Sequence, residues 1–182
     1  MTNEEAATVL HDSIGTIYEN ADVEIPLRSD GTEYSIEDLA ADQRETLAHV
    51  LNAVRLYCGG KDVNSEKVLH VTLSGVAGSG KSTWINTLVT VLRKMFTKDE
   101  TVAVFAPTGS AAFNAGGETV HRGFKLPQKL EDLSISSAKQ AYLLRRFATM
   151  LVIIIDERSM LDAGMLGIMQ YYMAQCAHQG NN

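Results

Sequence analysis

The stretch SGVAGSGKSTW, from Ser74 to Trp84, decides the fold class. From Gly75 to Ser82 it matches the pattern G-x-x-x-x-G-K-[ST] without a mismatch. Glycines let the backbone bend until successive N–H groups face a phosphate, and the start of a helix adds partial positive charge. We therefore predict a phosphate-binding loop in which Lys81 reaches the β- and γ-phosphates and Ser82 offers its hydroxyl to Mg²⁺.

The segments on either side of this loop predict an α/β fold. VLHVTLSG (68–75) has the length of a strand, and KSTWINTLVTVLRKMF (81–96) is predicted to be a helix. Two more strands are predicted over TVAVFAPT (101–108) and LVIIIDE (151–157). The last is apolar without alternation, which predicts burial on both faces. Strands that alternate with helices are typical of a parallel sheet with flanking helices.

Helix signals elsewhere complete this outline. Helices are predicted over NEEAATVLHDSIGTIYEN (3–20), SIEDLAADQRETLAHVLNAVRLYCGG (35–60), GSAAFNAG (109–116), SAKQAYLLRRFATM (137–150) and MLDAGMLGIMQYYMAQCAHQ (160–179). Ser35 and Asp38 fit a capping box, and Asp162 is expected to cap the last helix. Asp30-Gly31 signals a turn, and residues 117–134 are predicted to be irregular. We predict an acidic N-terminal helix and connector over 1–34, followed by the phosphate-loop domain over 35–182.

Charge and composition narrow the class of protein. The net charge is −6, but residues 1–66 hold 14 acidic and 4 basic residues, whereas residues 67–182 hold 8 and 12. This asymmetry suits a nucleic-acid groove in the second part, and equally a solvated face. No apolar run approaches the roughly 20 residues that cross a bilayer. Cys58 and Cys176 lie outside zinc-ligand spacing, and we expect buried or unreactive thiols in a reducing, intracellular compartment.

Two adjacent acids, Asp156 and Glu157, end the third predicted strand. Open parallel sheets bind ligands at the carboxyl ends of their strands. Mg²⁺ needs a carboxylate, and an attacking water needs a base. We assign Asp156 to Mg²⁺, partly through water, and Glu157 to positioning and deprotonating the water. The plainer alternative is an acidic strand end that caps the next helix. The pair favours hydrolysis of ATP or GTP over phosphate transfer to a small acceptor.

The stretch FAPTGSAAFNAGGETVHRGFKLP (105–127) combines groups that suit a single nucleic-acid strand. Thr108, Gly109 and Ser110 place two hydroxyls and bare backbone at a predicted helix start, where an anion is favoured. Basic and aromatic side chains follow in a segment predicted to be irregular: His121, Arg122, Phe124 and Lys125. Such a mixture suits phosphates and stacked bases. A surface turn with an aromatic anchor explains the same residues.

Three of these stretches together resemble a family. GVAGSGKST, APTGSAAFNAGGETVHRGFKLP and IIIDERSML resemble the first motifs of superfamily 1 DNA helicases, and most of all the petite-integration-frequency (Pif-type) branch, which is related to RecD. The resemblance covers about Leu39 to Gln175. It implies a RecA-like domain whose parent protein couples ATP hydrolysis to five-prime-to-three-prime movement on single-stranded DNA. It also implies roles in DNA repair after damage, recombination or telomere maintenance, in the nucleus of a eukaryote or the cytoplasm of a bacterium or virus.

The resemblance also implies roles for individual residues. Gln43 matches a glutamine that hydrogen-bonds adenine, although by itself a helical glutamine is usually just solvated. The phosphate loop that holds ATP comprises Gly75, Val76, Ala77, Gly78, Ser79, Gly80, Lys81, Ser82 and Thr83. Contacts with single-stranded DNA are implied for Pro107, Thr108 and Gly109 and, in a second motif, for Thr119 and His121. Asp156 and Glu157 match the pair that binds Mg²⁺ and activates water. Arg158 stands where many relatives carry an apolar residue.

Parts of the family's pattern are absent from this sequence. A G-D-x-x-Q-L-P motif, the strand before it and a second RecA-like domain are not found. We therefore expect an incomplete RecA-like domain, without the strand that follows LVIIIDE, that binds nucleotide weakly and does not unwind DNA without the remainder of the helicase. The alternatives are a stand-alone small kinase or ATPase, which would use the Arg145-Arg146 pair in a lid, and a catalytically dead binding module. Trp84 and the methionines of the last predicted helix are expected to be packing residues.

Overall fold

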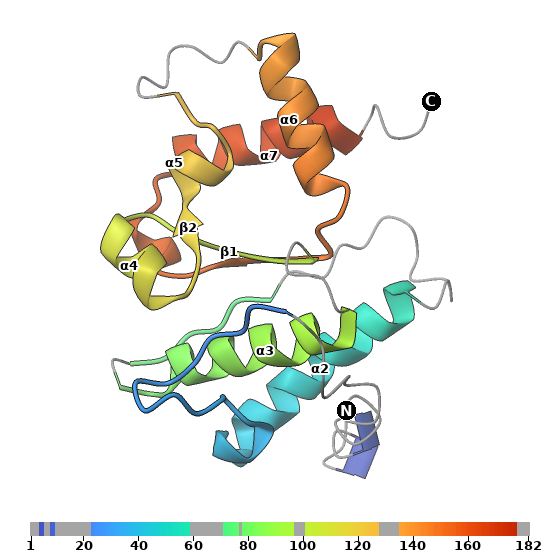
Figure 1. Cartoon of the computed structure of the whole chain (residues 1–182), viewed down its shortest axis with the longest axis vertical. Helices are drawn as coiled ribbons and strands as arrows, with labels where there is room; N and C mark the ends of the chain where they lie inside the picture. The colour runs from blue at the N-terminus through green and yellow to red at the C-terminus, as the bar shows by residue number, and fades with distance from the viewer. Residues whose placement is uncertain are drawn as a thin grey trace. The chain divides into compact units, whose positions relative to one another are not determined.

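The computed structural model describes residues 4–5, 8–9, 23–58, 71–76, 78–96, 101–127 and 135–177. The chain divides into two compact units, 1–99 and 100–182. Helices are labelled in Figure 1 within each unit. The predicted division between residues 34 and 35 stays a prediction.

The first unit is built on two helices, α2 (Ala41–Cys58) and α3 (Lys81–Phe96), which contact each other. α3 begins and ends at the residues predicted for it. Its residues 84–92 are all buried, including the polar residues Asn86, Thr87 and Thr90. α2 buries the stripe formed by Leu47, Ala48, Val50 and Leu51. Its exposed end carries Cys58, whose thiol has its pKa raised by partial burial. Of the two alternatives predicted for the thiols, burial is wrong for Cys58, and low reactivity stays a prediction.

The single helix predicted from Ser35 is interrupted. A 3₁₀ turn, η1 (Ile36–Asp38), comes first, and it carries the predicted capping box between Ser35 and Asp38. Leu39 is then extended and buried, which ends the turn. The side-chain oxygen of Gln43 accepts a hydrogen bond from the Ala40 N–H at 3.1 Å, as in the second half of a capping box. This bond starts α2 as a separate helix.

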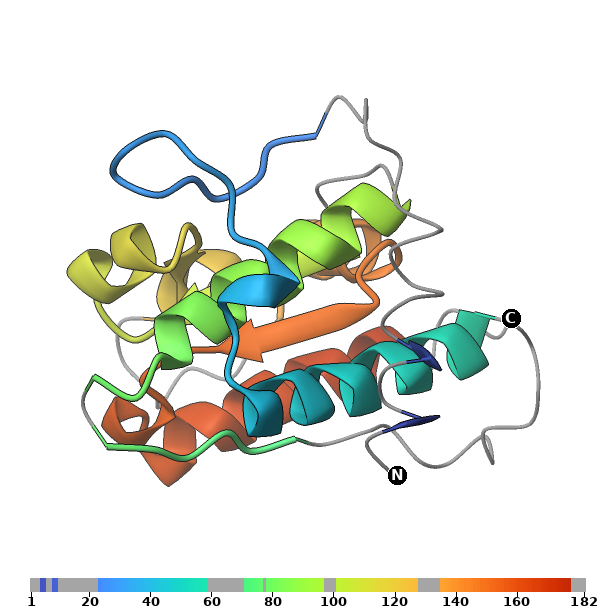
Figure 2. The ribbon, with the colours of Figure 1, turned by 90° about the horizontal axis from the view of Figure 1, so that it is seen from below.

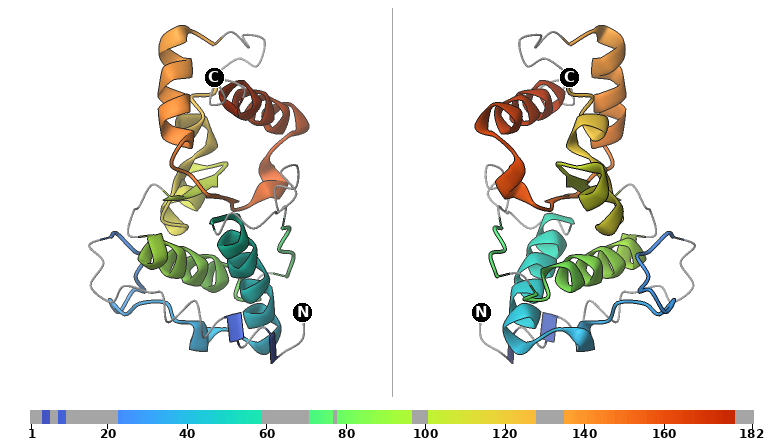
Figure 3. Two further views of the ribbon diagram at one scale, coloured as in Figure 1. Left: turned by 90° about the vertical axis from the view of Figure 1, so that its right-hand side faces the viewer. Right: turned by 90° about the vertical axis from the view of Figure 1, so that its left-hand side faces the viewer.

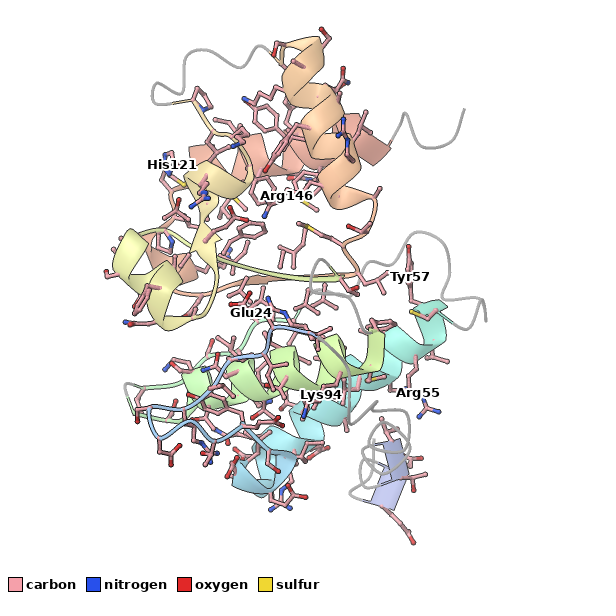
Figure 4. All side chains as sticks on the ribbon, in the orientation of Figure 1. Glu24, Arg55, Tyr57, Lys94, His121 and Arg146 are labelled. Carbon is pink, nitrogen blue, oxygen red and sulfur yellow. The ribbon has the colours of Figure 1, made fainter. Side chains whose placement is uncertain are left out.

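A short acidic segment before η1 is attached to α3. Its turn lies at the predicted Asp30-Gly31, where the Thr32 hydroxyl and N–H lower the pKa of the Asp30 carboxyl. The guanidinium of Arg93 donates to the carbonyl oxygen of Glu24 at 2.6 Å, and Lys94 forms an ion pair with Glu33. Figure 2 shows this segment passing alongside α3, and Figure 4 labels Lys94 and Glu24. The connector is thus part of the first unit's structure.

Two predictions for the first unit have different outcomes. Residues 4–5 and 8–9 are helical, in agreement with the helix predicted over 3–20, whose remaining residues lie outside those described. Residues 71–76 form no strand, and Val71 is exposed. The strand predicted over 68–75 is therefore wrong for its described part. A strand persists only where a neighbouring strand supplies hydrogen bonds, and an apolar run alone does not provide one.

The second unit contains a parallel sheet. β1 (Val102–Ala106) lies between β2 (Glu118–Thr119) and β3 (Val152–Ile155), so the order is β2-β1-β3. All five residues of β1 are buried. β3 is an edge strand of the described sheet, and its four residues are only half-buried. The predicted burial of β3 on both faces is therefore wrong: Ile153 and Ile155 pack against the core of this unit but stay only partly buried, and Val152 and Ile154 are half-buried as well.

The described helical segments of this unit accompany the sheet. They are α4 (Gly109–Asn114), α5 (Val120–Gly123), α6 (Ser137–Phe147), η3 (Arg158–Met160) and α7 (Ala163–Ala177). Asp162 caps α7 as predicted, because its carboxylate accepts from the Met165 N–H at 2.7 Å. The prediction of irregular structure over 117–134 is wrong where β2 and α5 form, and residues 128–134 lie outside those described. Figure 3 shows α6 against α7.

The core of the second unit lies where α5, α6 and α7 meet the sheet. Phe124 contacts Phe105 and Phe147, with ring centroids 5.0 and 5.2 Å away. Tyr172 of α7 is fully buried, and its hydroxyl accepts from the Lys139 ammonium at 2.7 Å. The packing role predicted for the methionines is confirmed for Met169 and Met165. It is wrong for two others, Met160 and Met173, which are exposed.

Among the helices built from described residues, none is both long and apolar enough to cross a membrane.

Candidate nucleotide and DNA sites

The phosphate loop has the backbone that its glycines were expected to allow. Gly78 and Gly80 have φ values of +77° and +79°, a region that residues with a Cβ rarely adopt. A hydrogen bond from the Ser79 N–H to the Val76 carbonyl oxygen, 3.2 Å long, closes the turn. Ala77 lies outside the described residues. The loop then enters α3 directly, so its glycines place the chain at a helix N-terminus.

Lys81, the first residue of α3, folds back onto the loop. Its ammonium donates to the carbonyl oxygens of Gly75 and Val76 at 2.7 and 2.8 Å and approaches the Ser79 hydroxyl at 3.4 Å. The charge is therefore held at the mouth of the loop by neutral acceptors. Phosphate oxygens would be stronger acceptors for the same donors, because they are ionised. Ser82 is exposed, and Thr83 is half-buried.

Gln43 lies against the phosphate loop, so the reading of it as an ordinary solvated helical residue is wrong. Its side-chain nitrogen donates to the Ser79 carbonyl oxygen at 2.9 Å, across 36 residues of sequence. A Cβ added at Gly80 would lie 3.0 Å from that nitrogen. The structure thus brings together, within the first unit, the residue predicted for adenine and the loop predicted for phosphates.

Three predicted motifs of the second unit meet at one edge of the sheet. Pro107 follows β1, Thr119 ends β2 and pairs in register with Ala106, and Asp156 follows β3. The Asp156 N–H donates to the carbonyl oxygen of Phe105 at 2.9 Å, which extends the ladder to the carboxylate. Because the strands are parallel, this edge holds the carboxyl ends of all three, where α/β folds bind ligands. The phosphate loop belongs to the other unit, and its convergence with Asp156 and Glu157 stays a prediction.

The residues predicted to contact DNA have two kinds of environment. Thr108 and Thr119 are helix N-caps, whose hydroxyl oxygens accept from the N–H groups of Ala111 and Arg122 at 3.2 and 3.3 Å. The Thr119 hydroxyl keeps its own hydrogen as a donor, and the Thr108 hydroxyl shares a 3.3 Å hydrogen bond with the Ser110 hydroxyl, in which either oxygen can donate. Pro107 is half-buried, whereas Gly109 and His121 are exposed, and Figure 4 labels His121 on α5. This edge therefore offers hydroxyl donors, bare backbone and an imidazole on one surface.

The two acids after β3 are held in an unusual turn. Asp156 is half-buried, and its carboxylate accepts from the Glu157 N–H at 2.9 Å. Glu157 is exposed and has φ +50° and ψ +40°, in the left-handed region. For a residue with a side chain this costs about 1–2 kcal/mol. Strain of this kind is concentrated at functional sites. Arg158, whose role the sequence left open, begins η3 and is exposed.

Two glycines that sequence reasoning missed set the geometry of this edge. A Cβ at Gly117 would lie 2.2 Å from the Val104 carbonyl oxygen, and a Cβ at Gly123 would lie 2.1 Å from the Phe105 ring. Both positions therefore require glycine because β2 and α5 approach β1 so closely. The repeated glycines of GGETVHRG were the available signal.

An exposed aromatic residue and an ion pair were also missed. The side chain of Phe113 on α4 is 85% exposed, although large apolar side chains are usually covered. Glu118 of β2 forms an ion pair with Arg146 of α6, which Figure 4 labels. Arg146 also donates to the Tyr142 hydroxyl at 2.8 Å. The mixed basic and aromatic composition pointed to this region, but its pairings depend on tertiary contacts.

The donor set suits magnesium. Ser82 presents an exposed hydroxyl, and one carboxylate oxygen of Asp156 remains beyond its bond to Glu157. Both are hard oxygen donors, and Mg²⁺ is usually held by one or two protein oxygens together with water and phosphate. No group of three or more His, Cys, Asp or Glu side chains that could hold a metal occurs among the described residues. That Ser82 of the first unit and Asp156 of the second hold one magnesium ion stays a prediction.

Comparison with known proteins identifies the family. The family model described as PIF1-like helicase matches residues 38–182. The chain belongs to this family. It is 42% identical over 113 residues to the ATP-dependent DNA helicase PIF1 of Candida albicans (strain SC5314 / ATCC MYA-2876), with 56% of this chain and 12% of that protein covered.

Two further relatives come from Saccharomyces cerevisiae. The ATP-dependent DNA helicase RRM3 (strain ATCC 204508 / S288c) is 36% identical over 104 residues, which cover 56% of this chain and 14% of that protein. The ATP-dependent DNA helicase PIF1 (strain YJM789) is 32% identical over 143 residues, which cover 72% and 16%. Across these three relatives the chain spans 12% to 16% of the relative's length. No solved structure matches the chain.

Proposed function

We propose that this PIF1-like chain is the nucleotide-binding part of an ATP-dependent DNA helicase. The observation that carries the proposal is the phosphate loop, with Lys81 at its mouth and Gln43 bonded to its backbone, in a chain of this family. The proposed parent protein moves five-prime to three-prime on single-stranded DNA and acts in repair, recombination or telomere maintenance. Its location is the reducing compartment that holds the DNA, the nucleus in a eukaryote. The proposed partner of this chain is the remainder of the helicase.

The proposed chemistry divides between the two units. In the first, the loop and the Lys81 ammonium bind the triphosphate, and Gln43 recognises adenine. In the second, Asp156 would hold Mg²⁺ through the carboxylate oxygen that is not bonded to Glu157, and Glu157 takes a proton from the attacking water. The bound magnesium ion supplies positive charge that stabilises the transferring phosphoryl group. Hydrolysis requires the groups of the two units to converge on one bound nucleotide.

Replacing Lys81 with alanine is expected to weaken ATP binding about 10- to 100-fold, because charge-assisted hydrogen bonds contribute about 1.5–3 kcal/mol. The measurement is titration of the purified chain with Mg²⁺–ATP by calorimetry. Lys94→Ala is the matched control, since Lys94 lies on the same helix and pairs with Glu33 outside the loop. Equal affinity for ATP in K81A and the wild type would contradict the proposal.

Single-stranded DNA distinguishes this function from its alternatives. Stimulation of ATP hydrolysis by DNA supports the helicase assignment, whereas product formation on a small metabolite without DNA would support a kinase. The structure disfavours the kinase, because Arg146 of the predicted lid pair is bonded to Glu118 and Tyr142. If the biological function of the chain is unchanged in both K81A and E157Q, the alternative of a catalytically dead binding module would be supported.

We propose that the DNA strand crosses α4 and α5 at the carboxyl edge of the sheet. Thr108 and Thr119 donate to its phosphates, the bare backbone at Gly109 permits close approach, and Phe113 stacks on a base. An exposed aromatic face suits any base, because stacking needs no sequence-specific hydrogen bond. The exposure of Phe113 supports this role.

Phe113→Ala is expected to weaken binding of single-stranded DNA about tenfold or more, since base stacking on an aromatic residue contributes about 1–3 kcal/mol. Fluorescence anisotropy of a labelled oligothymidine measures the affinity. Tyr57→Ala removes a side chain that is 69% exposed on α2 and serves as the control. Both variants should unfold at the wild-type urea concentration. Equal loss of DNA affinity in the two variants would argue against the proposed path.

A further inference from the structure

Trp84 makes a contact that packing alone does not require. It is the only tryptophan of the chain and the fourth residue of α3, and its side chain is 5% exposed. Its indole N–H donates to the backbone oxygen of Gln43 at 2.9 Å, across 41 residues of sequence. A buried indole N–H needs an acceptor, and here the acceptor lies in the first turn of α2. The bond ties the helix after the phosphate loop to the backbone of Gln43.

The Gln43 side chain is held at the same time by two other bonds. Its oxygen accepts from the Ala40 N–H at 3.1 Å, and its nitrogen donates to the Ser79 carbonyl oxygen at 2.9 Å. The primary amide has two hydrogens and two oxygen lone pairs. One hydrogen and one lone pair therefore remain, which is the donor and acceptor combination that one edge of adenine requires.

We propose that Trp84 is a positioning residue for adenine recognition: its bond to the Gln43 backbone fixes the remaining donor and acceptor of the amide relative to the phosphate loop. This inference rests on the proposed function, in which Gln43 reads adenine and the loop holds phosphates. Phenylalanine would fill much of the same space but has no N–H. Without the indole bond, the backbone of Gln43 loses its hydrogen bond to α3, and its amide is oriented only by the bonds to Ala40 and Ser79.

The test measures base preference together with affinity. The purified chain, W84F and Q43A are titrated with ATP, GTP and inorganic tripolyphosphate, the last being a probe without a base. The wild type should prefer ATP over GTP. Loss of one hydrogen bond predicts that W84F binds ATP up to about tenfold more weakly and GTP or tripolyphosphate within about twofold of the wild type. Q43A should also lose the preference for ATP, but because it removes the bond to the Ser79 carbonyl oxygen of the loop as well, it should weaken the binding of all three ligands.

Each other outcome has a definite meaning. A wild-type preference for ATP that W84F retains overturns the positioning role and leaves the proposed function intact. If W84F binds all three ligands more weakly by the same factor, the positioning role is also overturned, because a role in folding alone would lower every affinity of the site. A wild type that binds ATP and GTP equally overturns adenine recognition, and one that binds none of the three overturns the proposed function as well.

A measurement on the wild type covers the case in which W84F does not fold. The chain has one indole N–H, which gives a single nitrogen-15 NMR resonance. That resonance should be protected from exchange with solvent and should shift differently with ATP than with GTP or tripolyphosphate. Identical shifts with all three ligands, or rapid exchange in the unliganded chain, would overturn the proposal.

Discussion

Gly117→Ala is expected to destabilise the sheet-containing unit by about 3 kcal/mol, at the upper end of overpacking costs. A Cβ at this position would lie 2.2 Å from the Val104 carbonyl oxygen and 2.8 Å from the Val104 carbonyl carbon and Cβ. Two of these atoms belong to the backbone of the fully buried β1, so the clash cannot be relieved by rotating a side chain. Relief requires β2 to move away from β1, which breaks their two paired positions.

Urea unfolding followed by circular dichroism measures this effect. Gly167→Ala is the matched control, because Gly167 lies in α7, has no atom within 4 Å of an added Cβ and has no positive φ. A helical glycine replaced by alanine at such a site should gain about 0.5–1 kcal/mol. The two changes add the same methyl group and have opposite expected signs. Unfolding of G117A at the wild-type urea concentration would show that the close approach of β2 to β1 is wrong.

Replacing Glu157 with glutamine is expected to lower the rate of ATP hydrolysis about 10²- to 10⁴-fold, the usual contribution of a general base. ATP affinity should remain within about twofold of the wild type, since the proposed role is to take a proton from water and not to bind phosphate. The exposed carboxylate and the left-handed backbone at this position support the assignment. Single-turnover hydrolysis with the chain in excess over ATP, in the presence of single-stranded DNA, measures the chemical step even when it is slow.

Two further variants separate chemistry from folding. Glu45→Gln makes the same chemical change on α2 and should hydrolyse ATP at the wild-type rate. Glu157→Gly should lose hydrolysis but be no less stable than the wild type, because glycine relieves the cost of φ +50°. A wild-type rate no higher than that of E157Q would contradict the role of Glu157 as the base. Destabilisation of E157G would contradict the strained turn.

Local patterns in the sequence were sufficient for several elements. The limits of α3, the capping box at Ser35 and the cap at Asp162 follow from periodicity and from side chains that bond to backbone a few residues away. The phosphate loop follows from glycines whose positive φ values are a local property. Gln43 and the DNA-contact motifs came from the family resemblance, because composition and spacing alone do not single them out.

Other features depend on which segments meet in space. Residues 71–76 are apolar enough for a strand but form none, and the apolar strand β3 is only half-buried. Glu118 and Arg146 are 28 positions apart in sequence, yet they form an ion pair. Sequence patterns do not record such partners, because a strand or an ion pair is completed by a distant segment.

What the sequence by itself determined is therefore the inventory: a phosphate loop at the start of a helix, a pair of acids after a strand, and capped helices around them. These features are encoded by residues that interact within a few positions of one another. Only the tertiary structure decided how Trp84 and Ser79 hold Gln43, and how Gly117 allows β2 to lie beside β1. The physical reason is that hydrogen bonds and close contacts between distant segments form only when the folded chain brings their atoms together.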